Sequence, residues 1–194
     1  GAAASRTRGL WAGGGPGSSG QINIDYVNIS SLGNAGDFGD LTESRTEVDG
    51  LSTQTRGVFA GGYKLPAMRN ILDYITFTST GNAVDFGDLG QTRGAQGQHG
   101  GASTVRGLWA GGQWGSPYNG NTIEYITVAT LGNSAEFGDL FTGQSTNGSA
   151  AATTATKMYM MGGGPGGDQT GVITFATLGN SIDFGGEIVM GGNY

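Results

Sequence analysis

One sequence pattern occurs four times in the chain, and this repetition restricts the chain to folds built from equivalent units. Each copy contains a Gly-Gly pair, a Gly-Asn pair and an acidic residue followed by Phe-Gly, always in this order. The Gly-Gly pairs begin at Gly13, Gly61, Gly111 and Gly162, so they are spaced 48, 50 and 51 residues apart. The Gly-Asn pairs begin at Gly33, Gly81, Gly132 and Gly179, and the acidic residues are Asp37, Asp85, Glu136 and Asp183. We therefore divide the chain into units 1–48, 49–97, 98–147 and 148–194, which together form a single repeat domain.

Apolar patterning predicts four β-strands in each unit, and no stretch shows helical periodicity with caps. In the third unit, the small residues 100–103 predict a first strand, and the apolar run 108–110 predicts a buried second strand. The glycine pair that follows allows positive φ. Residues 122–129 alternate between two apolar faces, so the third strand must be covered on both sides, as in sheets stacked between like neighbours. Phe137 marks the fourth strand.

A constant spacing links the third strand of each unit to the fourth. Tyr and Phe are twelve residues apart in Tyr26–Phe38, Tyr74–Phe86 and Tyr125–Phe137. The Gly-Asn pair between them is typical of hairpin turns. The spacing therefore predicts a fixed cross-strand register.

The composition excludes several classes of function. The chain has no cysteine, so disulfides, thiolate metal sites and cysteine nucleophiles are absent. Its 9 Lys and Arg residues are scattered and the net charge is −6, which predicts no nucleic-acid partner. No apolar run approaches the roughly 18 residues that cross a bilayer, so we expect no membrane insertion.

The candidate catalytic residues have structural interpretations. Asp-Phe-Gly holds magnesium in protein kinases, but here it is repeated without a catalytic loop. The recurring acidic pairs, such as Asp37 and Asp40, favour turn stabilisation or pairing with Arg8, Arg56 and Arg106 over metal binding. His99 is the sole histidine, lies in a glycine-rich linker and receives no chemical role. We therefore predict no enzymatic activity, no catalytic residue, no metal and no cofactor.

The loops after the glycine pairs differ among the units, so the fold does not dictate them. They span residues 15–21, 63–70, 113–122 and 164–169, and contain all four prolines. Tyr63, Lys64, Trp114 and Tyr118 lie in these loops, and we predict that they bind a sugar or a protein surface. The alternative is that each loop folds onto its own blade. Trp11 and Trp109 are instead predicted to pack between blades, with Phe59 and Tyr159 replacing them in register.

Four short strands per unit, with a glycine pair ending the second, resemble the kelch repeat of β-propellers. The segments that end in Arg45 and Arg93 resemble the kelch inter-blade link, whereas the third link, Phe141-Thr142-Gly143, has no arginine. Kelch repeats place a Tyr and then a Trp after the glycine pair; here Ile29, Phe77, Val128 and Phe175 take the first place and Phe takes the second. The resemblance implies an all-β fold, a β-propeller of four kelch-like four-stranded units, or four such units of a larger propeller.

The repeat is more similar to Gly-Gly…Ile-Asp-Tyr-Ile…Gly-Asn-Ala…Asp-Phe-Gly-Asp-Leu-Thr repeats in virion structural proteins of tailed phages that infect marine cyanobacteria. This resemblance implies a non-enzymatic structural or adhesion module located in the virion. Its partners would be other virion proteins or a host-surface glycan or protein, and it allows a homo-oligomer. Two alternatives stay open: a glycan-active propeller enzyme and a cytoplasmic kelch-type interaction adaptor. Residues 188–192 resemble a fifth apolar strand, which would close the ring or contact another subunit.

Overall fold

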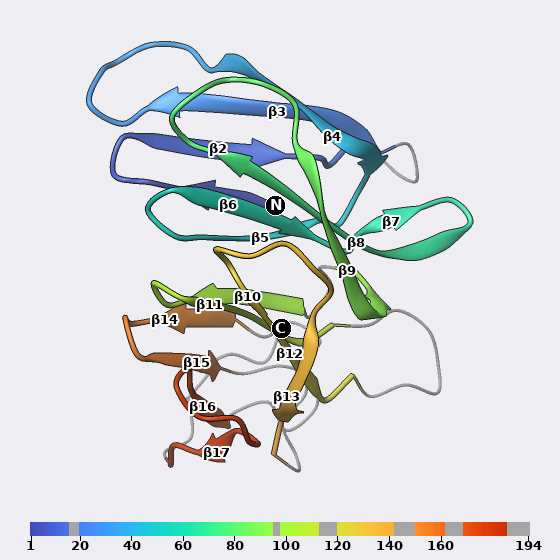
Figure 1. Cartoon of the computed structure of the whole chain (residues 1–194), viewed down its shortest axis with the longest axis vertical. Coiled ribbons are helices and arrows are strands. Elements are labelled where there is room, and N and C mark those ends of the chain that lie inside the picture. The colour runs from blue at the N-terminus through green and yellow to red at the C-terminus, as the bar shows by residue number, and fades with distance from the viewer. Residues whose placement is uncertain (16–19, 95–97, 113–119, 142–149, 162–168, 186–194) are drawn as a thin grey trace, which may run out of the picture.

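The computed structural model describes residues 1–15, 20–94, 98–112, 120–141, 150–161 and 169–185. These residues form strands and no helix, so the chain is all-β, as the sequence predicts. The strands build four antiparallel sheets in a β-propeller-like arrangement, and the sheets follow one another from the top to the bottom of Figure 1.

Each sheet is built from consecutive strands of one repeat unit. The first contains β1 (Ala2–Ala4), β2 (Arg8–Ala12), β3 (Gln21–Asn28) and β4 (Gly36–Arg45). The second contains β5 (Asp49–Ser52), β6 (Arg56–Ala60), β8 (Ala67–Thr76) and β9 (Val84–Arg93), with β7 (Tyr63–Lys64) also paired to β8. The third contains β10 (Gln98–Ala102), β11 (Arg106–Gly111), β12 (Thr122–Thr127) and β13 (Ala135–Asp139). The fourth contains β14 (Ala150–Thr153), β15 (Lys157–Met161), β16 (Thr170–Thr174) and β17 (Ile182–Asp183).

The first strands of successive sheets lie against one another, in the order β1, β5, β10 and β14. Their residues are small because the backbones approach closely. A Cβ atom on Gly50 of β5 would lie 2.2 Å from the backbone oxygen of Ala2 on β1. The sequence pattern of small residues at the start of each unit is thus explained by the packing of these inner strands.

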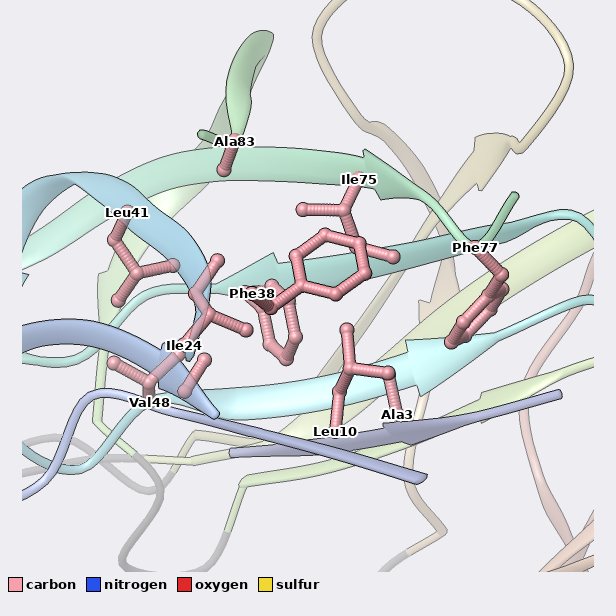
Figure 2. Close-up of a cluster of buried hydrophobic side chains, with 11 residues drawn as sticks. Ala3, Leu10, Ile24, Phe38, Leu41, Val48, Ile75, Phe77 and Ala83 are labelled. Carbon is pink, nitrogen blue, oxygen red and sulfur yellow. The ribbon is translucent and has the colours of Figure 1, made fainter. Parts of the chain in front are cut away.

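Three apolar cores fill the three junctions between successive sheets. We call the side of a sheet that meets the preceding unit its leading face, and the opposite side its trailing face. Alternation along a strand separates the two faces. Leu10 and Ala12 on β2 belong to the first junction, whereas Val58 and Ala60 on β6 belong to the second. In the first junction Phe38 and Leu41 of unit one pack with Ile75 and Phe77 of unit two (Figure 2). Phe59 of unit two belongs to the same core.

The Tyr–Phe spacing gives the predicted cross-strand contact. The ring centroids are 5.9 Å apart in Tyr26–Phe38, 5.9 Å in Tyr74–Phe86 and 5.8 Å in Tyr125–Phe137, each pair edge to face. The fourth unit makes the same kind of contact between Tyr159 and Phe184, at 5.2 Å. Phe184 is nevertheless 56% exposed, whereas Phe38, Phe86 and Phe137 are buried.

The Gly-Asn pairs bind the fourth strand of the preceding unit. Gly81 N donates to Phe38 O at 2.7 Å, Ala83 N donates to Asp40 O at 2.7 Å, and Asn82 Oδ1 accepts from Asp40 N at 3.1 Å. The same three bonds recur at the other two junctions. The Gly-Asn pairs lie in the connection between the third and fourth strands, as predicted, but this connection is longer than a two-residue turn, since in unit one it runs from residue 29 to residue 35. Gly39 is required here, because its φ is +147° and a Cβ atom would lie 2.4 Å from Gly81 O.

Two predictions about tryptophan packing need correction. Trp109 is fully buried, but Trp11 is 53% exposed, because in the described part of the chain nothing covers the leading face of unit one. The register also places Met160, and not Tyr159, at the position of Trp109. Met160 lies opposite Gly171 just as Trp109 lies opposite Glu124.

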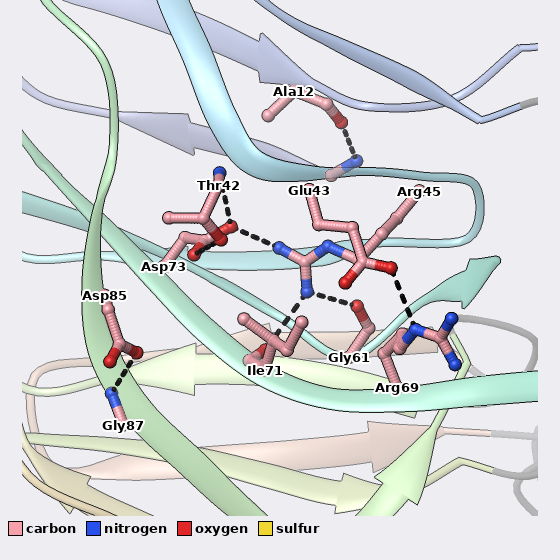
Figure 3. Close-up of polar contacts among 11 residues, drawn as sticks. Ala12, Thr42, Glu43, Arg45, Gly61, Arg69, Ile71, Asp73, Asp85 and Gly87 are labelled. Carbon is pink, nitrogen blue, oxygen red and sulfur yellow. Dashed lines mark hydrogen bonds and ion pairs between the residues drawn. The ribbon is translucent and has the colours of Figure 1, made fainter.

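The predicted pairing of Arg8, Arg56 and Arg106 with the recurring acidic pairs is wrong among the described residues. Their Nη1 atoms donate instead to backbone oxygens of the next unit, those of Phe77, Val128 and Phe175, at 2.7, 2.8 and 2.7 Å. Each guanidinium also lies over a tyrosine ring of its own unit, at about 5 Å. The alternative role, turn stabilisation, is seen at Asp85, whose Oδ1 accepts from Gly87 N at 3.1 Å (Figure 3).

Candidate functional site

The variable loop of the second unit forms a β-hairpin. Tyr63 lies opposite Met68 and Lys64 lies opposite Ala67, and the Leu65-Pro66 peptide is cis. The hairpin projects from the edge of the second sheet in Figure 1. Leu65 at its tip is 63% exposed, and Pro66 is exposed as well. An ordered projection with an apolar tip is suited to contact a partner.

The hairpin is held against the first unit by ion pairs and by backbone hydrogen bonds. Glu43 on β4 lies 3.1 Å from Lys64 Nζ and 3.0 Å from Arg69 Nε (Figure 3 shows the contact with Arg69). Tyr63 and Thr46 exchange two backbone bonds of 2.8 and 2.9 Å. Burial by itself would raise the pKa of Glu43, but the hydrogen bonds from Arg69 and Lys64 outweigh it and hold the pKa below its ordinary value. Glu43 therefore remains ionised and keeps both cations in place.

Arg45 closes the base of this loop from the preceding unit. Its Nη1 donates to the backbone oxygens of Gly61 and Ile71, at 2.6 and 3.1 Å, which stand on either side of the loop (Figure 3). Its Nη2 donates to the carboxylate of Asp73. One guanidinium thus ties together both ends of the loop and the third strand beneath it, which its rigid, forked geometry allows.

Arg93 repeats this arrangement at the third unit. Its Nη1 donates to the backbone oxygens of Gly111 and Thr122, at 2.6 and 3.0 Å, and its Nη2 lies 2.5 Å from Glu124 Oε2. We call the contacts of Arg45 and of Arg93 the arginine clamps. Each clamp comes from one unit and fixes the loop ends of the next.

Both clamps are buried ion pairs. Burial lowers the pKa of Arg45 and raises the pKa of Asp73, and the attraction between the two charges opposes both changes. Burial also lowers the pKa of Arg93, with Glu124 opposing it. Thr42 donates to Asp73 through its backbone N–H and its hydroxyl, and Gly90 N donates to Glu124 Oε1 at 2.7 Å. These additional donors supply the further hydrogen bonds that a buried ion pair needs.

The predicted binding residues fall into two groups. Tyr63 and Lys64 lie side by side in the hairpin, both half-buried, and Lys64 is paired with Glu43. Trp114 and Tyr118 lie outside the described residues, as does the predicted fifth strand at residues 188–192.

No arrangement typical of catalysis or metal binding is found in the part of the chain that the structure describes. Groups of three or more potential metal ligands do not occur there. A groove of about 350 Å³ runs along β1, β5 and β10, but its lining includes no ionisable side chain. His99 lies on β10 and not in a linker, because the first strand of the third unit begins at Gln98. No helix in the described chain could cross a membrane.

The chain matches no protein-family model and no curated protein.

The sequence singles out Arg45 and Arg93 as link residues, but the acidic partners of these arginines were not predicted. Arg45 and Arg93 each follow the recurring Phe of their unit by seven residues, and an acidic residue stands at the same register in the next unit. The third link loses the arginine, and Gly171 occupies the acidic register in unit four. This joint presence and joint loss was visible in the sequence, but only an alignment by strand register brings the two positions together.

Proposed function

We propose that the protein is a non-enzymatic structural and adhesion module of a virion, which presents binding loops on a rigid propeller-like scaffold. The arginine clamps are the observation that carries this proposal. They fix both ends of a variable loop without using any residue of the loop tip. A framework of this kind lets the tips change while their stems stay in place.

Binding by such loops follows from pre-organisation and repetition. A loop with fixed ends loses less conformational entropy when it binds, so more of its contact energy appears as affinity. Several weak contacts on one scaffold also add through effective concentration, more so if the particle carries many copies. The partners we propose are other virion proteins or a glycan or protein of the host surface. Similarity to the repeats of tailed-phage virion proteins supports the location.

The test uses fluorescently labelled protein on cells of marine cyanobacteria, with bound label counted by flow cytometry. We expect saturable binding that Leu65→Asp and the double variant Trp114→Ala/Tyr118→Ala each reduce several-fold. Leu131→Asp is the matched control, because Leu131 is also exposed but lies outside the variable loops. Binding that survives both loop variants would contradict the proposed role of the loops. Release of reducing sugar ends from host polysaccharide would instead support the glycan-active alternative.

A further inference from the structure

The leading face of unit one exposes apolar side chains whose counterparts in the other units are buried. Trp11 is 53% exposed, while Phe59, Trp109 and Met160 at the same register are fully buried. Ile29 is 57% exposed, while its counterparts Phe77, Val128 and Phe175 are buried. In units two to four the preceding unit covers this face. Unit one therefore presents a complete junction surface with nothing described against it.

The leading face of unit one also carries the counterparts of the polar groups that make contacts at the three junctions. Asp25 lies opposite Trp11 in the sheet, just as Asp73 lies opposite Phe59 and Glu124 opposite Trp109. Asp73 and Glu124 are buried by their arginine clamps, whereas Asp25 is exposed. Gly33, Asn34 and Ala35 are exposed too, although their counterparts bind the fourth strand of the preceding unit at all three junctions. The face thus combines apolar side chains, two backbone donors, an amide oxygen and a carboxylate.

The charge pattern of the junctions identifies what fits there. Arginine and acid occur together at the first two junctions. At the third, Gln144 stands seven residues after the Phe and Gly171 stands at the acidic register. The buried Ser181 hydroxyl accepts from Phe141 N at 2.9 Å there, as Ser134 accepts from Gly90 N at the second junction. Asp25 therefore matches the acidic partner of the first two junctions, where the neighbouring unit supplies an arginine. The last unit of this chain has Gly191 seven residues after Phe184, so it offers none.

We propose that the leading face of unit one docks a further unit of this repeat, whose fourth strand carries Phe-Gly-Asp with an arginine seven residues after the Phe. That arginine pairs with Asp25, and the strand bonds to Gly33, Asn34 and Ala35. Closure by unit four of this chain, or docking by unit four of a second copy, would leave Asp25 without a cation. Two leading faces brought together would place one Asp25 near the other.

The test extends the full chain at its N-terminus by a copy of residues 1–48, so that an arginine-bearing unit precedes Gly1. Amide hydrogen exchange is followed by NMR. We expect Gly33 and Ala35 to exchange rapidly in the 194-residue chain and at least about 100-fold more slowly in the extended chain. The same slow exchange is expected of Gly81 and Ala83, whose N–H groups are hydrogen-bonded across the first junction. The matched control is the same extension with the copied Arg45→Gln.

A double-mutant cycle then tests the charge pairing. Asp25→Asn should leave the melting temperature of the 194-residue chain unchanged and lower that of the extended chain by several degrees. It should have no such effect when the copied arginine is already Gln. Rapid exchange at Gly33 in the extended chain, or an absence of coupling, would overturn the proposal. Concentration-dependent dimers of the 194-residue chain that protect Gly33 and that Phe184→Asp abolishes would assign the face to a second copy and overturn it as well.

Discussion

At the residue scale, the two buried guanidinium groups, those of Arg45 and Arg93, depend most strictly on their hydrogen-bond and charge partners. Arg45 satisfies two backbone oxygens and one carboxylate, and a lysine could not reach all three because its donors spread from a single atom. Such a pair is costly to break because the remaining partner keeps its charge in a buried place.

We therefore expect Arg45→Met to lower the free energy of unfolding by about 3–5 kcal/mol, since Asp73 is left buried and unpaired. Denaturant unfolding followed by fluorescence measures this. Arg6→Met is the control, because Arg6 is exposed, and it should change the midpoint little. An unchanged midpoint in Arg45→Met would show that the clamp contributes nothing to stability.

The third junction suggests how the clamp can be removed with less damage. The double variant Arg45→Gln/Asp73→Gly copies residues 144 and 171 into the first junction. It should be more stable than Arg45→Met, because no buried charge remains. A double variant as unstable as the sum of its single variants would argue against charge pairing at this site.

Asp49 makes the stability of the folded chain depend on pH. Burial raises its pKa from 3.8 to about 6, with the backbone N–H groups of Gly50 and Gly100 opposing the change. Since the folded pKa lies above the unfolded value, ionised Asp49 costs stability above about pH 6, and this cost is relieved as the pH falls toward 4. Asp49→Asn should raise the thermal midpoint at about pH 7.5, where Asp49 is ionised in the folded chain, and raise it much less at about pH 4, close to the unfolded pKa. An equal gain at both pH values would rule out the titration of Asp49 as the cause.

At the element scale, the phenylalanines of the fourth strands differ in burial. Those that face a following unit are buried, whereas Phe184 of the last unit is exposed. Phe86 is 2% exposed between units two and three, so Phe86→Ala should cost about 3–5 kcal/mol. Phe184→Ala is the matched variant in the last unit. Since Phe184 is 56% exposed, we expect it to cost about 1 kcal/mol or less, chiefly from its contact with Tyr159. Equal losses in the two variants would contradict the assignment of Phe86 to a junction core.

The Gly-Asn pairs offer a second matched comparison. Asn82 accepts a hydrogen bond from the backbone of Asp40 across the first junction, whereas Asn34 faces solvent. Asn82→Ala should therefore lower the free energy of unfolding by about 1 kcal/mol, and Asn34→Ala should leave it nearly unchanged. Chemical denaturation of both variants under one set of conditions measures the difference. A larger loss in Asn34→Ala would mean that the pair acts within its own unit.

At the scale of the whole molecule, the sequence predicts the strands and contacts within each unit but not the contacts that join one unit to the next. The all-β class, the strands and the Tyr26–Phe38 contact follow from local pattern and spacing. Arg45 and Asp73 are 28 residues apart in different units, so no periodicity within one strand brings them together. Trp11 and Trp109 occupy the same register in identical local sequence, yet one is exposed and one buried, because their neighbours differ and not their own residues.

Because the stability of each unit depends on its contacts with neighbouring units, these contacts predict which unit detaches first during partial unfolding. In an array whose stability is a sum of unit and junction terms, the weakest junction opens at the lowest free energy. All three junctions share an apolar core and the Gly-Asn bonds. Only the first two have an arginine clamp among the described residues. Unit four should therefore detach before the others unfold. Native-state hydrogen exchange at low denaturant should show Ile173 of β16 exchanging through a smaller opening free energy than Ile75 of β8. If the two amides instead exchange only through global unfolding, the clamps do not set the order in which the junctions open.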